Sequence, residues 1–569
     1  MQASRVRSRG LAFAIALVFL LATRQLGCDA YSGNGAHRTQ VDAFLAGRLA
    51  LSTSPDALAH DLAWTPSGVQ QVWGLGVAMW QTPFELGARA VGQDPFPDRI
   101  ALLVFLALAW FVLLRAFIRE GEPWWIGAGS ALITGLLPAL IAMVRGRMGV
   151  YEETALYAYA ATLILMGALV VFARGPTRNR YLVLLLLAGA TGLIRPTVWF
   201  YGFSTAVLAS AIYLRTHGRR VLPMVAIGAA LFVAGGGALY ATNAVRFGAG
   251  SEFGHRLNLE ALPGNVYATR FSYPFERTGY IEAGVELVGS LFGRPDTGKK
   301  GFYARDLHVG QSETVRWREY YFSTFSWPYV PLLLAALVLT VLAWKKRSDE
   351  RWLGTWAVIG ALPIFVFYLH SPSISSRYEL DLAPAIAALL VVAWRAWAKR
   401  PIAAGVLGAL WLAAVLTSHA RGRVASDLVD REAARAALAP APERAHELPS
   451  EYKLGDPELE TYLDADGKPP ELYLNGTGWD RATGRVAPAV HFFVVDPQFF
   501  DVEVDPPDAQ VRVAIGRQEL ALATRDGARL HFTLKAPMPG LQVAFLAFGP
   551  DTQLDLPQTR IVLRRVRWR

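Results

Sequence analysis

Long apolar blocks constrain the fold of this chain more than any other feature of its sequence. Hydrophobic residues make up 53% of the 569 residues, and most stand in stretches that short charged links separate. A helix of about 20 apolar residues is long enough to cross a hydrocarbon core of about 30 Å. We therefore predict a polytopic α-helical membrane protein with about 11 spans. The predicted spans are 10–27, 99–117, 124–144, 154–173, 180–194, 197–214, 221–241, 327–344, 353–370, 380–397 and 402–418.

Three of these spans need comment. The first follows a basic N-terminus, as a signal peptide does, but no A-x-A-like cleavage site follows it, and Gln25 in QLGC stands where a lipoprotein cleavage site has an aliphatic residue. We expect an uncleaved span. The pair 180–194 and 197–214 is split by IRPT, where Arg195 and Pro196 predict a bent or partly inserted helix hairpin.

Basic residues gather in every second link between the spans. Eighteen arginines and lysines stand in the links predicted to be cytoplasmic, against four in the short outer links: Arg145, Arg147, Arg195 and Arg377. Cytoplasmic loops of membrane proteins carry such an excess. The asymmetry predicts a cytoplasmic N-terminus and an extracytoplasmic C-terminus. It also accounts for the net charge of +10 without a nucleic-acid partner.

Three long pieces are predicted to lie on the outer face, at 28–98, 242–326 and 419–569. The first two are loops of a transmembrane domain that we place at 1–418. The third begins with an Ala- and charge-rich linker, 419–450, and continues with alternating runs such as QVRVAIG and RLHFTL. Period-two alternation between turn residues is typical of antiparallel strands. We expect an extracytoplasmic all-β sandwich at 451–569.

Several chemistries are excluded by what the sequence lacks. Cys28 is the single cysteine, so neither an internal disulfide nor a cysteine metal cluster can form. The sequence has no GxxxxGKS/T phosphate loop, no HExxH and no GxSxG in a suitable context. We expect no cofactor, and nothing in the sequence indicates a divalent metal.

Polar side chains near the ends of the spans are the candidate functional groups, because burial near the bilayer is costly for them. The first outer loop contains several acids and histidines: Asp29, Asp42, Asp56, Asp61, His37 and His60. It also contains Trp64, Trp73 and Trp80, which predict segments in the membrane interface or a belt of anchoring aromatics.

Arginines in the other outer pieces can hold a phosphate through charge-assisted hydrogen bonds. Arg145 and Arg147 stand near Glu152 and Glu153, where mutual ion pairing that caps two helices is an equally good interpretation. Two further groups have a structural alternative. A solvated loop equally explains the first, and a helix start explains the second: Arg246, Glu252, His255 and Arg256; and Arg377, Tyr378, Glu379 and Asp381.

These residues carry a resemblance to the GT-C superfamily of integral-membrane glycosyltransferases. Within it, the chain is most similar to the bacterial family-39-like mannosyltransferase and aminoarabinose-transferase group. The resemblance rests on AFLAGRLALS and WGLGVAMWQTPFEL in the first loop, VYEETALYAYA, GLIRPT, RFGAGSEFGHRLNL and SSRYELDLAPA, in that order over residues 8–418. The C-terminal ELYLNGTGWD and FFVVDPQFF resemble the sandwich appended to some bacterial relatives.

The resemblance implies an inverting transfer of a sugar from a polyprenyl-phosphate donor on the outer face of the bacterial cytoplasmic membrane. An acid of the first outer loop deprotonates or orients the acceptor hydroxyl. Its expected place falls near Ser32–Asn34, where Asn34 cannot act as a base. We expect a neighbour to serve, with Asp42, Asp29 and Asp61 as the candidates in that order; otherwise the chain has lost catalysis.

The same resemblance implies the remaining roles and partners. The donor phosphate is expected to bind arginines: Arg145, Arg147, Arg246, Arg256 and Arg377. Substrate-binding candidates are His37, Glu152, Glu153, Glu252, His255 and Tyr378. The expected partners are the polyprenyl-phosphate sugar, a glycan, lipid or protein acceptor from the envelope, and the bilayer.

Two other interpretations remain open. A transporter or flippase for a lipid-linked sugar would carry polar residues in mid-span and inverted repeats, whereas the polar residues here stand mostly at the outer ends. A non-catalytic envelope-assembly protein would keep the scaffold without the base, and Asn34 is the best argument for it.

Overall fold

The structure is a computed structural model, and it describes the chain in separate ranges. These are 31–33, 35–53, 62–65, 67–119, 121–135, 149–254, 281, 284, 287–288, 317–319, 329–345, 350–369, 373–400, 402, 405–409, 428–438, 477–479, 485–495, 497–515, 518–538, 541–548 and 559–568.

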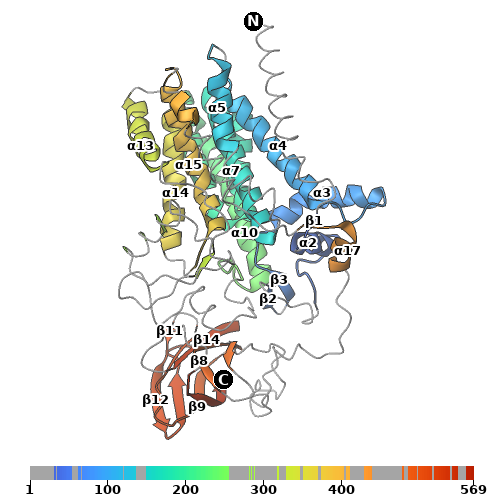
Figure 1. Ribbon diagram of the computed structural model, residues 1–569, viewed down its shortest axis with the longest axis vertical. Helices are drawn as coiled ribbons and strands as arrows, with labels where there is room; N and C mark the ends of the chain where they lie inside the picture. The colour runs from blue at the N-terminus through green and yellow to red at the C-terminus, as the bar shows by residue number, and fades with distance from the viewer. Residues whose placement is uncertain are drawn as a thin grey trace.

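Apolar helices form a bundle that makes up about half of the described chain (Figure 1). Six stretches of helix in this part are long and apolar enough to cross a membrane: Asp98–Phe117, Val150–Arg174, Pro196–His217, Arg219–Phe247, Glu350–Leu369 and Leu380–Trp397. The helices of the bundle are α4 (Asp98–Phe117), α5 (Trp124–Gly135), α7 (Val150–Arg174), α8 (Arg178–Ile194), α9 (Trp199–His217), α10 (Leu222–Phe247), α13 (Tyr329–Lys345), α14 (Glu350–Leu369) and α15 (Ser376–Trp397).

These helices lie where the apolar blocks predict them, although the predicted number of eleven spans is not established. The span predicted at 10–27 lies outside the described residues, as does most of 402–418. The span predicted at 124–144 is described only to its residue 135, as α5. The short span predicted at 180–194 corresponds to α8, which has 17 residues.

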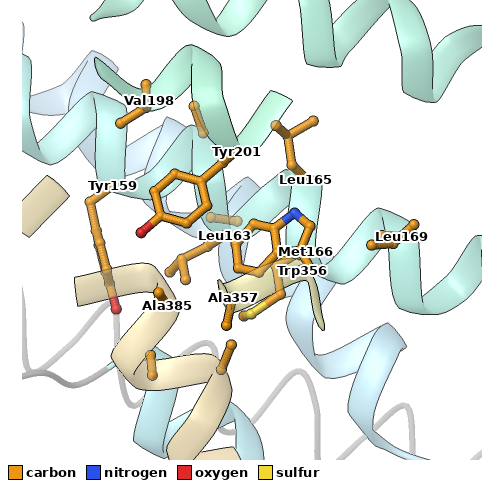
Figure 2. Packing of buried hydrophobic residues seen from close by; sticks show 14 of the residues in the cluster. Tyr159, Leu163, Leu165, Met166, Leu169, Val198, Tyr201, Trp356, Ala357 and Ala385 are labelled. Atoms are coloured by element: carbon orange, nitrogen blue, oxygen red, sulfur yellow. The ribbon is translucent and has the colours of Figure 1, made fainter. Parts of the chain in front are cut away.

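The centre of the bundle is filled by α7, which is buried along most of its length. Figure 2 shows Tyr159 and Met166 of this helix beside Tyr201 of α9 and Trp356 of α14. The indole nitrogen of Trp356 donates to Thr205 Oγ1 over 2.8 Å, so even the polar atom of this large side chain is satisfied inside the core.

Helices α8 and α9 form the hairpin that IRPT predicts. α8 ends at Ile194, Arg195 is extended, and the short 3₁₀ helix η2 (Pro196–Val198) leads into α9. The two helices run antiparallel, because Tyr181 near the start of α8 stacks on Tyr213 near the end of α9, with ring centroids 4.7 Å apart. A second 3₁₀ helix, η3 (Arg219–Val221), joins α9 to α10.

Glycines allow these helices to touch backbone to backbone. A Cβ on Gly235 of α10 would lie 2.3 Å from the carbonyl carbon of Gly189 in α8, and one on Gly202 of α9 would lie 2.2 Å from the oxygen of Ala188. Small residues at such crossings are typical of helix packing in membranes, where close backbone contact replaces the hydrophobic drive.

The two ends of the bundle differ. At one end, which we call the α2 end, α4, α7 and α15 begin and α8, α10 and α14 end. The small elements of the first predicted outer loop lie there: β1 (Tyr31–Ser32), α2 (Ala36–Leu45), β2 (Leu62–Thr65), β3 (Gly68–Gln71) and α3 (Gly76–Ala90) (Figure 1). Strands β4 (Trp317–Glu319) and β5 (Ser373–Ser375) form a parallel pair at the start of α15.

The opposite end is closed by an ion-pair network. Arg395 near the end of α15 is 3% exposed, with Nη2 lying 2.5 Å from Glu122 Oε2 and Nε lying 3.2 Å from Glu350 Oε1. Arg119 also lies within 3.5 Å of Glu350. The link between α4 and α5 is thereby joined to the start of α14, and the charges balance one another.

The described part of the predicted linker, 419–450, contacts the first outer loop. Strand β6 (Leu428–Val429) pairs with β1, and the following helix α17 (Arg431–Leu438) covers the link between α3 and α4. Arg431 donates to the side-chain oxygen of Gln93 and to the backbone oxygen of Asp94, both over 2.9 Å.

The C-terminal described residues form two antiparallel sheets, drawn in orange to red below the bundle in Figure 1. One has the order β11-β10-β14-β8-β7 and the other β12-β13-β9-β15. Alternate side chains of β9, such as Phe500 and Val502, enter an apolar core that also contains Val513 and Leu546. The strands are β7 (Thr477–Trp479), β8 (Val486–Val495), β9 (Phe499–Asp505), β10 (Val511–Ile515), β11 (Gln518–Glu519), β12 (Ala521–Asp526), β13 (Arg529–Thr533), β14 (Leu541–Phe548) and β15 (Val562–Trp568).

The close contact of α8 and α10 predicts an asymmetric effect of two neighbouring glycines. Gly235→Ala places a methyl group against the backbone of Gly189, and we expect it to destabilise the fold by about 1–3 kcal/mol, as overpacking does. Gly237 on the same helix has nothing within 4 Å of its would-be Cβ. Thermal unfolding of the purified variants in detergent checks this: equal unfolding temperatures for Gly235→Ala and Gly237→Ala would contradict the described packing.

Candidate functional site

Helix α2 is fixed to the start of α4 by a buried ion pair. Arg38 and Asp98 are 2% and 1% exposed, and Arg38 Nη1 lies 2.5 Å from Asp98 Oδ2. The backbone N–H of Ser32 donates to the same carboxylate over 3.0 Å, and Arg38 Nη2 donates to the oxygen of Ser32 over 2.9 Å. Asp98 is also the first residue of its helix, where a negative charge is favourable. The charges of the pair therefore balance, and Arg38 Nε is left without a hydrogen-bond partner among the described residues.

His37 connects α2 to the start of α7. Its Nε2 lies 2.9 Å from Thr154 Oγ1, and its ring meets that of Trp73 edge to face at 6.4 Å between centroids. Trp73 in turn contacts Tyr151 at 5.3 Å. Burial lowers the pKa of His37 to about 3, because the charged ring would lose its hydration. A neutral imidazole can accept or donate a hydrogen bond here, but it cannot supply charge to a phosphate.

Two buried acids occupy the first turn of α7. Glu152 and Glu153 are both fully buried. Glu153 Oε1 accepts a hydrogen bond from Gln81 Nε2 of α3 over 2.5 Å. Glu153 Oε2 has no hydrogen-bond partner within the described part of the chain. One carboxylate oxygen of this turn is therefore unsatisfied, at the α2 end of an otherwise apolar helix.

Arg246 lies buried at the end of α10 and contacts the chain just after β3. Its Nη2 donates to the backbone oxygens of Gln71 and Trp73, the second over 3.3 Å, and its guanidinium stands over the ring of Phe247 at 4.5 Å. Arg246 is 2% exposed. Among the residues that the structure describes, it forms no ion pair with a carboxylate, unlike Arg38, Arg195 and Arg395.

The two residues whose backbone oxygens Arg246 binds also carry unsatisfied side-chain atoms. Within the described ranges, Arg246 Nε, Trp73 Nε1 and both amide atoms of Gln71 are buried and have no hydrogen-bond partner. A buried N–H without a partner costs about 1–3 kcal/mol, and a charged one costs more. An oxyanion can satisfy such donors, since phosphate oxygens accept several N–H bonds.

Asp42, the first candidate base, lies one turn after Arg38 on α2 but pairs with a different helix. It forms an ion pair with Arg89 of α3, which also contacts Glu85. The Asp42 side chain is 34% exposed. Partial burial raises the pKa of Asp42 above its usual value, and the Arg89 charge opposes this rise. Asp42 is thus accessible and partly desolvated, but already paired.

A second buried network lies at the same end, around Asp381. Arg195 Nε lies 2.9 Å from its carboxylate, and Thr197 Oγ1 and Tyr368 OH donate to its Oδ2 over 2.6 and 2.5 Å. Tyr378, a predicted substrate-binding residue, stacks on Tyr368 at 5.1 Å and lies below the Arg195 guanidinium at 5.8 Å. Every polar group in this network has a partner.

The structure brings some of the predicted site residues together. His37 and Arg246 both contact Trp73, and Glu152 and Glu153 are buried in the same turn of α7 as Tyr151, whose ring contacts that of Trp73. Glu252 lies in the turn after α10, with Oε1 accepting the N–H of Phe253 and of Gly254. The remaining predicted residues lie outside the described residues, as does Asn34: Asp29, Asp61, Arg145, Arg147, Arg256 and His255. Arg377 belongs to α15, but its side chain is not among those described.

Sequence reasoning did not select Asp98, Gln71 or Gln81. Asp98 stands at the start of a predicted span in PFPDR, and the preference of helix N-termini for acids is a signal that points to it. The two glutamines carry no comparable signal. Within the described part of the chain, no cluster of three or more histidine, cysteine, aspartate or glutamate side chains is arranged to hold a metal ion.

Comparisons with known proteins add little. No protein-family model matches the sequence, and no curated protein matches it either. Among solved structures, the chain is similar to the arabinosyltransferase EmbB from Mycobacterium smegmatis, at 10% sequence identity and a TM-score of 0.35. The match covers 98% of this chain and 64% of EmbB, so the chain spans less than two thirds of that protein's length. The functional argument therefore depends on this chain's own residues.

Burial of neutral His37 predicts a pH-dependent stability. The unfolded chain binds a proton at this residue below pH ~6.5, whereas the folded chain does not until pH falls to about 3, so stability decreases as pH decreases through this window. Between pH 7.5 and 5 we expect the loss to be about 2 kcal/mol greater than in His37→Gln.

Thermal unfolding across this pH range measures the effect. An identical pH dependence in the native chain and in His37→Gln would contradict the buried neutral histidine.

Proposed function

We propose that this chain is an integral-membrane glycosyltransferase. It transfers a sugar from a polyprenyl-phosphate-linked donor to an envelope glycan, lipid or protein, with inversion at the anomeric carbon. The reaction takes place at the α2 end of the bundle, which faces the outside of a bacterial cytoplasmic membrane, with the N-terminus inside and the C-terminus outside. The transmembrane domain spans 1–418, and a sandwich at 451–569 follows a linker, 419–450.

One observation carries the proposal: Arg246 is a buried guanidinium for which the described residues offer no carboxylate. A charge buried without compensation costs several kcal/mol. An anionic ligand removes this cost, and the unsatisfied N–H groups of Trp73 and Gln71 can donate to the same anion. A phosphate monoester or diester has the required charge and acceptor oxygens.

The position of this cluster supports a lipid-linked phosphate as the ligand. It lies where the apolar helix α10 ends, so a ligand with an apolar chain can keep that chain beside the helices while its phosphate meets Arg246. Helix α10 exposes apolar side chains along its length, including Val233 and Val245, as expected for a helix in contact with lipid.

The proposed reaction needs a base and a stabilised leaving group. Asp42 takes the proton of the acceptor hydroxyl, the hydroxyl oxygen attacks the anomeric carbon, and the bond from that carbon to the phosphate oxygen breaks. The departing polyprenyl phosphate carries the released negative charge, which Arg246 stabilises. The raised pKa of Asp42 makes it a stronger base than an ordinary surface aspartate. Arg145, Arg147, Arg256 and Arg377 remain proposed phosphate contacts, and Asp29 and Asp61 remain alternative bases.

The phosphate-binding role of Arg246 is tested by the release of polyprenyl phosphate from a panel of polyprenyl-phosphate sugars in nanodiscs. We expect Arg246→Gln to reduce release by about 10² or more, as loss of an oxyanion contact does. Arg351→Gln is the matched control, because Arg351 is also buried but lies at the start of α14, at the opposite end. Equal activity of the two variants, or no release and no lipid binding by the folded native protein, would refute the proposal and favour a scaffold or a transporter.

The role of Asp42 is tested by separating its chemistry from its ion pair. Asp42→Asn removes the base, and we expect a decrease in release of roughly 10²–10⁴ with donor affinity retained. Arg89→Gln breaks the same ion pair but leaves the carboxylate, so most activity should remain. If the two variants lose activity equally, Asp42 is only a structural partner of Arg89, and Glu153→Gln then tests the buried alternative.

A further inference from the structure

The buried network around Asp381 lies close to the proposed phosphate site but forms no part of it. Asp381 is 1% exposed and belongs to α15, whereas its three side-chain partners come from the α8–α9 link and from α14. Tyr201 of α9 adds a fourth bond, from its hydroxyl to the backbone oxygen of Asp381 over 2.9 Å. The network thus fixes the tip of the α8–α9 hairpin to two later helices.

The tip of this hairpin supports the segment that carries Trp73. A Cβ on Gly74 would lie 2.2 Å from the backbone oxygen of Leu193 and 2.4 Å from that of Ile194. One on Gly76 would lie 2.9 Å from the backbone nitrogen of Ile194. The backbone of 74–76 therefore rests directly on the two residues that precede Arg195, without a side chain between them to absorb a shift.

The same segment is also held by Arg246, which binds the backbone oxygens of Gln71 and Trp73. Residues 71–76 thus contact both Arg246 and the hairpin tip. A displacement of the tip changes the position of the Trp73 indole N–H and of the Gln71 amide relative to Arg246. Because binding geometry depends on fractions of an ångström, such a shift weakens an anion held by all three groups.

We propose that Arg195 and Asp381 are positioning residues for the phosphate site, which hold residues 71–76 in register with Arg246 through the tip of the α8–α9 hairpin. The inference rests on the proposed function for the identity of the ligand. It does not require Arg195 or Asp381 to touch the substrate. Helices α14 and α15 contribute no residue to the cluster of Gln71, Trp73 and Arg246. Under this proposal they nevertheless help to fix its geometry.

A matched pair of acid-to-amide substitutions tests this role. Asp381→Asn removes the charge that holds Arg195. Glu350→Gln removes the corresponding charge from the Arg395 network at the opposite end of the bundle. Both variants weaken a buried ion pair and are expected to lower the unfolding temperature, so a purely structural role predicts the same behaviour for the two. If Asp381→Asn does not fold, Thr197→Val removes one hydrogen bond from the same carboxylate at almost unchanged volume.

Two readouts are compared in the full-length chain in nanodiscs. The first is hydrogen exchange in peptides that cover residues 70–77, which needs no ligand. We expect exchange there to increase roughly tenfold in Asp381→Asn and to remain unchanged in Glu350→Gln. The second is the affinity for undecaprenyl phosphate, which we expect to fall roughly tenfold in Asp381→Asn and not in the control.

The outcomes separate the two proposals. Unchanged exchange at 70–77 in Asp381→Asn, or equal losses of affinity in both variants, would overturn the positioning role. Increased exchange in Asp381→Asn alone, with no binding of undecaprenyl phosphate by the native chain, would establish the positioning role and reject the proposed ligand.

Discussion

A charge buried at the end of an apolar bundle needs a partner, and the α2 end of this molecule depends on how that need is met. Asp98 has Arg38, and Asp381 has Arg195, each supported by further hydrogen bonds. In such pairs the opposite charge offsets much of the cost of burial, and the further hydrogen bonds reduce it again. Arg246 is different: in the described chain its contacts are backbone oxygens and an aromatic ring, and its charge is not neutralised.

Buried ion pairs also fix the small elements at the α2 end. Arg38 and Asp98 hold α2 against α4, and Ser32, which bonds to both of them, belongs to the strand β1 that β6 extends. Strand β6, which follows the last predicted span, thus pairs with the first loop and stabilises it. The result is a set of small elements, none of them long enough to be stable alone, fixed at the end of the bundle by side-chain bonds and short strand pairs.

Much of the bundle could be predicted from the sequence, because each apolar block is a local signal that needs no knowledge of its neighbours. The hairpin at Pro196 was predictable for the same reason, since proline interrupts a helix wherever it stands. Strands also lie where period-two alternation predicts them, as at Phe499–Asp505, although their arrangement as a separate sandwich domain stays a prediction.

The site was harder to predict because its contacts join distant parts of the chain. Arg38 and Asp98 are 60 residues apart, and Arg246 contacts residues 173 and 175 positions away. Nothing local distinguishes Gln71 or Trp73 from other polar and aromatic residues of the first loop. Asp42 was a reasonable candidate base from its place on α2, but its partner Arg89 depends on how α3 folds back against α2.

The measurement that tests this account most directly is an experimental structure of the chain in nanodiscs with bound undecaprenyl phosphate. The account predicts the phosphate at the α2 end, with one of its oxygens about 3 Å from the Arg246 guanidinium and another within reach of the Trp73 indole nitrogen. A phosphate bound elsewhere, with Arg246 paired to a carboxylate of the protein itself, would contradict it.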